Sequence, residues 1–321
     1  MNPALEVEVK DIARREAAAL LRQHGIDVRQ HVLEAILPAV QAEAARQVAA
    51  QIPATPVLEV HTGRRRRTKR IRGPYHHLLP QIIKMASSRS HDGFPLALWL
   101  YGPPGTGKSF IAKQVAEALG ASYYLVPLGP TSTESKLVGF QNLVNGQFVP
   151  GLLCEPFKNS GLAFLDEVDV ADPGVLVGIN ALISNDRFRF PDGAVVERHR
   201  DFYLLAGGNT IGTGGTSGFT RNKLDAAFLD RFVKVKVDYD PQLESALCDN
   251  DAWVSYVQKV RLHLQRSTLG TFYVTSRAVI NGAALLEAGI PASVVVESVL
   301  LPGCTDAIRR DIKIKIGEFK A

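Results

Sequence analysis

Apolar side chains in the first part of the chain recur at the spacing of helices. Residues 6–24 and 29–50 are rich in Ala, Leu, Glu, Arg and Gln, and each stretch carries an apolar stripe. The proline-bounded sequence QIPATPV ends this pattern. We therefore predict a helical N-terminal segment over residues 1–56. Such a segment is typical of an oligomerisation or partner-docking bundle.

From residue 75 to residue 240 the pattern changes to short apolar runs that alternate with helical stretches. These runs have the length of buried strands. Strands that alternate with helices predict an α/β fold, in which helices cover both faces of a parallel sheet. The predicted strands are LALWLY (96–101), SYYLVPL (122–128), GLAFLDEV (161–168) and DFYLLAGGN (201–209).

The strand pattern stops after residue 240. This shift in composition indicates a second, smaller domain, which we predict to be all-α and to cover residues 241–321. Its helical patterns fall at 241–266, 276–288 and 291–302.

The net charge of +5 is concentrated in one place. The sequence RRRRTKRIR at 64–72 carries seven positive charges, so the rest of the chain has a net charge of −2. Residues 57–74 form either a charged linker or a β-hairpin that turns at Gly63; the strand-like pattern of Val57–Val60 slightly favours the hairpin. The basic run would bind nucleic-acid phosphates in a salt-sensitive way, or an acidic protein partner.

The composition gives no sign of a membrane protein or a disulfide framework. Cys154, Cys248 and Cys304 are odd in number and scattered, which argues for a reducing compartment. No apolar run approaches the roughly 20 residues that a membrane span needs. The first residues lack the apolar core of a signal peptide. We expect a cytoplasmic protein that does not contact a membrane.

The sequence GPPGTGKS follows a predicted buried strand and opens a helix. This context makes the pattern G-x-x-x-x-G-K-[ST] a credible phosphate-binding loop, whose backbone N–H groups surround phosphates at a helix N-terminus. Lys108 would reach the β- and γ-phosphates of ATP, and Ser109 would bind Mg²⁺. The predicted nucleotide contacts are Gly102, Pro103, Pro104, Gly105, Thr106, Gly107, Lys108, Ser109 and Phe110.

A second predicted strand, in LAFLDEVD at 162–169, ends in a pair of carboxylates. Asp166 at the strand end suits Mg²⁺ held through water. Glu167 suits a general base that polarises an attacking water molecule. A carboxylate pair alone is common, but one that follows a phosphate loop favours catalysis. Asp169 has a less certain role and is a candidate structural residue.

Taken together, these features resemble an AAA+ ATPase over roughly residues 75–310. The resemblance rests on the phosphate loop, the strand that ends in Asp-Glu, the strand end AGGN, the sequence DRF and the helical C-terminal domain, in this order. GNTIGTGGTSGFTRNKLDAAFLDRF (208–232) and TSRAVINGAALL (275–286) resemble the MoxR-related branch, in particular the small AAA+ subunit of cobaltochelatase and similar phage ATPases. The resemblance implies a P-loop core over 75–240 and an α-helical lid over 241–321.

The resemblance also implies roles for three more residues. Asn209 matches the sensor that orients water at the strand end. Arg277 matches the second sensor, which touches the γ-phosphate as the lid closes. Arg231 matches an arginine that enters the neighbouring subunit's site, so the resemblance implies a homo-oligomeric ring, in the family's usual form a hexamer. An intramolecular ion pair with Asp225 or Asp230 is the alternative for Arg231.

Two sequences are predicted to form hairpins. Residues 137–151 have Asn145-Gly146 at the turn, and residues 187–200 have Asp192-Gly193 at the turn. The family resemblance implies that both contact substrates or partners. The arginines expected along the strands of the second hairpin are Arg187, Arg189, Arg198 and Arg200.

The resemblance implies a Mg²⁺- and ATP-dependent ring ATPase that remodels an unidentified partner protein. The basic segments 64–72 and 187–200 leave open a DNA-binding or DNA-translocating ATPase. The motor subunit of a metal chelatase is a third alternative. His76 and His77 are adjacent on a predicted helix, about 100° apart, so they cannot easily share a metal ion; their place in the family indicates the adenine pocket.

Overall fold

The computed structural model describes residues 57–62, 67–215, 221–267 and 272–319. The helical segment that we predict over residues 1–56 lies outside the described residues and stays a prediction.

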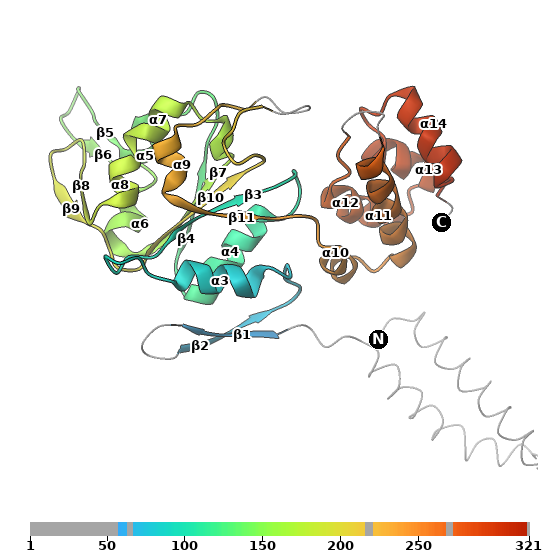
Figure 1. Cartoon of the computed structure of the whole chain (residues 1–321), viewed down its shortest axis with the longest axis horizontal. Coiled ribbons are helices and arrows are strands. Elements are labelled where there is room, and N and C mark those ends of the chain that lie inside the picture. The colour runs from blue at the N-terminus through green and yellow to red at the C-terminus, as the bar shows by residue number, and fades with distance from the viewer. Residues whose placement is uncertain (1–56, 63–66, 216–220, 268–271, 320–321) are drawn as a thin grey trace, which may run out of the picture. The chain divides into compact units, whose positions relative to one another are not determined.

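A five-stranded parallel sheet forms the centre of the α/β region (Figure 1). Its strands lie in the order β11-β3-β10-β7-β4, and each neighbouring pair is parallel. The three central strands are buried almost throughout, as expected where helices cover both faces of a sheet. The strands are β3 (Ala97–Tyr101), β4 (Tyr123–Pro127), β7 (Gly161–Asp166), β10 (Phe202–Gly208) and β11 (Phe232–Lys236).

Two hydrophobic cores lie on opposite faces of this sheet. On β3, Trp99 belongs to one core while Leu98 and Leu100 belong to the other, because side chains of a strand alternate between its faces. The predicted α/β fold with helices on both faces is confirmed. Helices α3 (Leu79–Ser87) and α4 (Lys108–Leu119) cover the face of Leu98. The Trp99 face is covered by α5 (Glu134–Val138), α6 (Cys154–Asn159), α7 (Pro173–Gly178), α8 (Asn180–Ser184) and α9 (Ala226–Asp230).

The helical stretch between β7 and the β8–β9 hairpin consists of short pieces. A 3₁₀ turn, η1 (Val168–Val170), comes first, and α7 and α8 are separate helices. Gly178 ends α7, and a Cβ built there would lie 2.8 Å from the carboxyl carbon of Glu134. The carboxylate of Glu134, from α5, thus packs against this end of α7.

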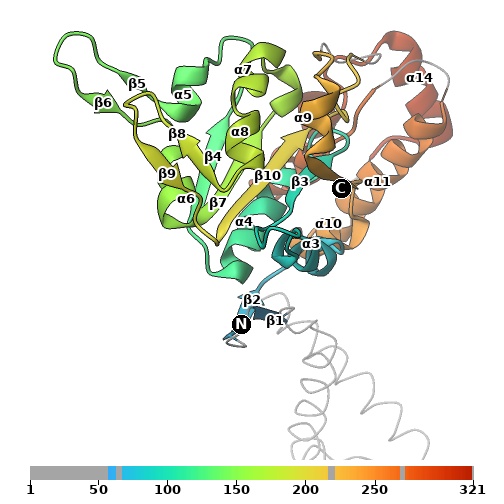
Figure 2. The same ribbon diagram turned by 60° about the vertical axis from the view of Figure 1, so that its left-hand side comes forward.

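Three two-stranded hairpins extend from this sheet and its helices. In the first hairpin Leu58 pairs with Ile71, and Ile71 is buried in the core of α3 and α4. Residues 63–66, which include Gly63 at the predicted turn, lie outside the described residues. The other two hairpins project from the same end of the domain (Figures 1 and 2). The hairpins are β1 (Val57–Thr62) with β2 (Arg67–Arg72), β5 (Phe140–Gln141) with β6 (Phe148–Val149), and β8 (Arg187–Arg189) with β9 (Val195–Glu197).

The segment after β11 is helical. The single helix predicted over 241–266 is two helices, because the Asn250 side chain accepts a hydrogen bond from the Trp253 N–H and starts a new one. Trp253 is buried against Gly282, where a Cβ would lie 2.2 Å from the indole ring. No helix in the described part of the chain is long and apolar enough to cross a membrane. The helices are α10 (Pro241–Leu247), α11 (Asp251–Arg266), α12 (Ser276–Glu287), α13 (Ala292–Val295), a π-helical turn η2 (Val296–Leu300) and α14 (Asp306–Lys315).

Candidate nucleotide-binding site

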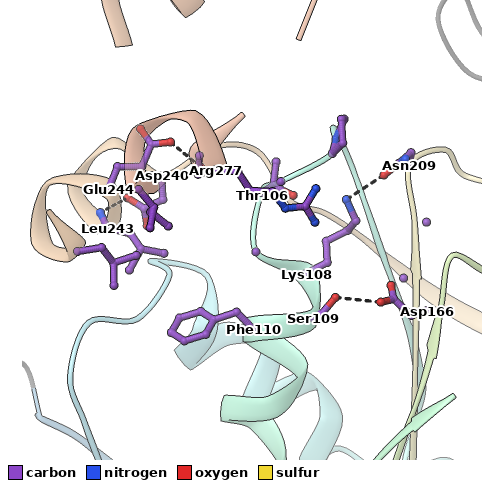
Figure 3. A pocket seen from close by; sticks show the side chains of 18 of the residues that line it. Thr106, Lys108, Ser109, Phe110, Asp166, Asn209, Asp240, Leu243, Glu244 and Arg277 are labelled. Carbon is purple, nitrogen blue, oxygen red and sulfur yellow. Dashed lines mark hydrogen bonds between the residues drawn. The ribbon is translucent and has the colours of Figure 1, made fainter. Parts of the chain in front are cut away.

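A cavity of about 460 Å³ lies between the phosphate loop, the carboxyl ends of β7 and β10, and the helices α10 and α12 (Figure 3). Ligands of parallel α/β sheets bind outside the carboxyl ends of the strands, so this is the expected place for a site. Among the lining residues are Thr106, Lys108, Ser109, Phe110, Asp166, Glu167, Gly207, Gly208, Asn209, Asp240, Leu243, Glu244, Leu247, Arg277 and Ile280.

The glycines of the phosphate loop permit backbone contacts that side chains would block. A Cβ at Gly102 would lie 2.0 Å from the Val237 carbonyl oxygen, and one at Gly105 would lie 2.7 Å from Thr275 Cβ. Gly107 has a φ of 86° and precedes the first residue of α4. Backbone N–H groups at this helix N-terminus are suited to an anionic ligand. The loop fits the triphosphate that the sequence predicts.

Lys108 is only 9% exposed, and its amine is held by oxygen atoms of its own chain. Its Nζ donates hydrogen bonds to the carbonyls of Gly102 (2.9 Å) and Pro103 (2.8 Å) and to Asn209 Oδ1 (3.2 Å). Burial lowers the pKa of the Lys108 amine to about 8, although the carboxylates of Asp169 and Asp166 oppose the shift. An anionic ligand would restore the usual preference for the charged amine.

The predicted metal ligands lie next to each other. Ser109 Oγ donates to Asp166 Oδ2 at 3.2 Å, so the hydroxyl of α4 meets the carboxylate at the end of β7. Hard divalent cations such as Mg²⁺ prefer oxygen ligands of this kind. Glu167 follows at once, exposed in the cavity, with a left-handed backbone at φ 56°. Non-glycine residues rarely adopt this conformation, and such outliers cluster at functional sites.

Asn209 is positioned by Asp169, which the sequence indicates as a candidate structural residue. Asp169 is fully buried, and its Oδ2 accepts hydrogen bonds from the Asn209 N–H (3.0 Å), the Thr210 N–H (2.9 Å) and the Thr210 hydroxyl (3.0 Å). Arg221 lies 3.2 Å from the same oxygen. Asp169 therefore fixes the end of β10 beside the phosphate loop.

Arg277 extends from the first turn of α12 toward the Lys108 side of the cavity (Figure 3). The two cations are close enough that Arg277 contributes to the lowered pKa of Lys108, after burial. Phe110, Leu243 and Ile280 also line the cavity, and they supply apolar surface suited to a flat base.

Arg231 lies outside the lining of this cavity. It caps the C-terminus of α9, and its guanidinium donates a hydrogen bond to the Ala227 carbonyl. Asp225 instead accepts hydrogen bonds from the N–H groups of Ala227 and Phe228. Within the described residues, Arg231 forms no ion pair with Asp225 or Asp230, and its buried Nε has no hydrogen-bond partner. The intramolecular alternative is therefore not supported by the geometry.

Of the four arginines expected along the strands of the hairpin at 187–200, Arg187 and Arg189 lie on β8 and are exposed, but Arg198 and Arg200 lie beyond β9. β9 ends at Glu197, and Arg198 is buried with its Cζ 4.9 Å from the Phe94 ring centroid and 5.2 Å from that of Phe202. Its Nη1 donates to the Ile183 carbonyl at 2.8 Å. Burial lowers the pKa of Arg198 to about 10. Arg198 and Arg200 do not decorate a strand, and that expectation is wrong.

His76, His77 and Asp240 bring candidate ligand atoms within 4.8 Å of one another. His76 Nδ1 accepts the Leu78 N–H at 3.2 Å, so its Nε2 carries the proton donated to the Asp238 carbonyl at 3.0 Å. No lone pair of His76 remains for a metal. His77 Nδ1 contacts Asp240 Oδ2 at 2.8 Å. The histidines therefore fix the start of α10, and they do not line the cavity themselves.

A comparison with protein families assigns the central part of the chain. Residues 97–232 match the family of the AAA domain (dynein-related subfamily). The match begins in the strand before the phosphate loop and ends at the first residue of β11. This stretch is similar to an AAA domain, and it has the P-loop α/β fold that the sequence predicts.

Curated relatives match part of the chain, and the chain spans only a small part of their length. Midasin from Giardia intestinalis is 30% identical over 148 residues, which are 45% of this chain and 3% of that protein. A Lon protease from Metamycoplasma arthritidis is 40% identical over 76 residues, 22% of this chain and 9% of that protein. A solved RuvB mutant from Thermotoga maritima has 15% identity and a TM-score of 0.43, covering 74% of this chain and 66% of that one. At that distance the structural likeness carries no functional argument.

Proposed function

We propose that this protein is a Mg²⁺- and ATP-dependent AAA+ ATPase that works as a ring and uses hydrolysis to remodel a partner protein. The observation that carries the proposal is the convergence of four residues on one cavity. Lys108 and Ser109 open α4, Asp166 ends β7, and Asn209 follows β10. The contacts Lys108–Asn209 and Ser109–Asp166, each 3.2 Å long, join these segments.

Bound Mg²⁺-ATP would supply the γ-phosphoryl group that is transferred to water. The amine of Lys108 would exchange its contacts with loop carbonyls for contacts with phosphate oxygens. That exchange would release Asn209 Oδ1, which now accepts from Lys108, to accept a hydrogen bond from the attacking water. Glu167, exposed on the same side, would take the proton of that water. Ser109 and Asp166 would hold the metal.

The position of Arg231 supports a ring, because it does not line the cavity of its own chain. A guanidinium that enters a neighbouring subunit's site stabilises the charge of the transition state. Its position after α9, outside the lining of the cavity and without an acidic partner among the described residues, fits delivery to another chain. We propose a homo-oligomer, with a hexamer as the ring size that the family resemblance implies.

The side chains of the β5–β6 hairpin favour a polypeptide as the substrate that the ATPase remodels. Its tip carries Leu143 and Val144, which are 98% and 96% exposed. Residues 139–151 contain no charged side chain. Exposed apolar side chains mark contacts with proteins, whereas phosphate contacts need cations. The MoxR-related assignment, which rests on the sequences at 208–232 and 275–286, fits the same function.

ATP turnover by the full chain tests the proposal. We expect turnover that requires Mg²⁺, and a loss of about 10²- to 10⁴-fold in Glu167→Gln with ATP binding retained. Glu117→Gln, on the exposed side of α4, is the matched control and should behave as wild type. Turnover that persists with a metal chelator, or that is unchanged in Glu167→Gln, would overturn the proposal.

The DNA-linked alternative rests on the basic run at 64–72 and on the exposed arginines of 187–200, from which the buried Arg198 is removed. The same assay separates the two functions when double-stranded DNA is added at low and moderate salt. Stimulation that falls as salt rises would favour a DNA-linked ATPase. Turnover that is indifferent to DNA would favour the remodelling of a protein, and a chelatase motor would need a further subunit to show activity.

A further inference from the structure

Tyr239 joins the phosphate loop to the helical region at the point where β11 leads into α10. Its hydroxyl donates to the Pro104 carbonyl at 2.9 Å. Its ring lies over the Arg261 guanidinium, with 4.0 Å between the ring centroid and Arg261 Cζ. Burial raises the pKa of the Tyr239 hydroxyl to about 12, so the hydroxyl keeps the proton that it donates.

Arg261 in turn is held by hydrogen bonds inside the helical region. Although it is charged, it is buried in α11, and it donates to both carboxylate oxygens of Glu244, at 2.6 and 2.9 Å. Its Nε donates to the Val274 carbonyl at 2.7 Å. Bidentate arginine–carboxylate pairs fix orientation as well as adding energy. The position of Glu244 is therefore tied to that of Tyr239.

Glu244 then reaches the start of α12. It accepts a hydrogen bond from the hydroxyl of Ser276, the residue before Arg277. Thr275 lies against Gly105 of the phosphate loop, where a Cβ would come within 2.7 Å. Two contacts thus connect the phosphate loop with the first turn of α12, one through Pro104 and one through Gly105.

We propose that Tyr239, Arg261 and Glu244 form a hinge network of positioning residues, which hold the start of α12 against the phosphate loop and so place Arg277 at the γ-phosphate. The inference rests on the proposed ATPase function and adds to it the means by which the chain distinguishes ATP from ADP. A buried ion pair is weak support for stability by itself, whereas its bidentate hydrogen bonds fix the orientation of both side chains. Movement of the loop around a nucleotide would reach Arg277 through the same hydrogen bonds.

Tyr239→Phe is the best probe of the hinge network. It removes one hydroxyl and keeps the ring on Arg261, whereas removing Arg261 or Glu244 would leave a buried charge without its partner and threaten the fold. Tyr256→Phe is the matched control, because the Tyr256 hydroxyl also donates to a backbone carbonyl, that of Gly317, at 3.1 Å. Gly317 lies far along the chain from the phosphate loop and does not line the cavity.

The measurement is the dissociation constant of the full chain for Mg²⁺-ATP and for Mg²⁺-ADP. We expect Tyr239→Phe to weaken ATP binding about tenfold, a usual size for coupling between sites, while ADP binding changes little. In an Arg277→Ala background, Tyr239→Phe should cause no further loss of ATP preference, because the hydroxyl acts through Arg277. Tyr256→Phe should leave the preference unchanged in both backgrounds.

Three results would overturn the inference. Equal weakening of ATP and ADP would mean that the hydroxyl only supports the loop. A further loss of ATP preference when Tyr239→Phe is added to Arg277→Ala would mean that the hydroxyl does not act through Arg277. The same loss in Tyr256→Phe would mean a general destabilisation. A wild-type chain that binds neither nucleotide would instead overturn the proposed function, and this inference with it.

Discussion

Lys108 and Arg231 both lie in the stretch that matches the AAA family, but their surroundings differ. Lys108 lines the cavity and donates hydrogen bonds to three oxygen atoms of its own chain. Arg231 lies outside the lining, and within the described residues no carboxylate pairs with it. Lys108 thus has all its hydrogen-bond acceptors around the cavity, whereas Arg231 donates to a backbone carbonyl, that of Ala227, and has no anionic partner among the described residues. Under the proposed function, nucleotide binding therefore needs one chain and hydrolysis needs two.

The largest expected effect comes from Arg231→Ala. We expect turnover to fall by about 10³-fold or more, the usual contribution of an arginine supplied in trans, with ATP affinity within threefold of wild type. Equilibrium binding of Mg²⁺-ATP and steady-state turnover, measured on the same preparation, check this. A parallel loss of ATP binding would place Arg231 in its own chain's site and contradict its action in a neighbouring chain.

An intermediate effect follows from the lowered pKa of Lys108. Burial brings the pKa of its amine to about 8, and bound phosphate favours the charged amine. Binding above that pH must take up a proton, so ATP affinity should be constant below pH 8 and fall by up to about tenfold per pH unit above it.

Titration of ATP binding between pH 7 and 9.5 checks this pH dependence. Arg231→Ala should follow the same curve as wild type, because a guanidinium stays charged throughout. A flat affinity over this range would mean that the amine of Lys108 does not meet the phosphates.

The smallest effect is expected from the exposed arginines of β8. Arg187 pairs with Asp186, and Arg189 donates to the Gly193 carbonyl, so both have partners inside their own hairpin. Arg187→Ala with Arg189→Ala should change turnover less than about twofold, with or without DNA, as surface substitutions usually do. A loss of turnover as large as that in Arg231→Ala would contradict the account. It would mean that arginines other than Arg231 are equally needed for hydrolysis.

Much of the fold and the phosphate site follow from local sequence. Asp166 and Asn209 are predictable together because parallel strands bring their carboxyl ends to one edge of the sheet. The glycines and Lys108 are predictable because the phosphate loop has a fixed spacing. The roles of these residues in binding and hydrolysis stay predictions that the experiments above test.

Other parts depend on contacts that a sequence does not encode locally. Asp169 binds backbone N–H groups some 40 residues away in the chain, which no side-chain pattern reports. Arg198 looks like a solvent-facing strand residue, but β9 ends one residue earlier and the guanidinium packs on Phe94 and Phe202. Glu244 and Arg261 look like exposed helix residues, yet they neutralise each other in the interior.

A subunit-mixing experiment tests the central claim most directly. Arg231→Ala keeps its own Glu167, and Glu167→Gln keeps its own Arg231, so each variant supplies what the other lacks. When the two are co-expressed and purified as mixed complexes, about a quarter of the interfaces in an equal random mixture should be complete. We predict turnover well above the sum of the two separate variants, with a maximum near equal mixing. Turnover equal to that sum at every ratio would contradict action of Arg231 in trans.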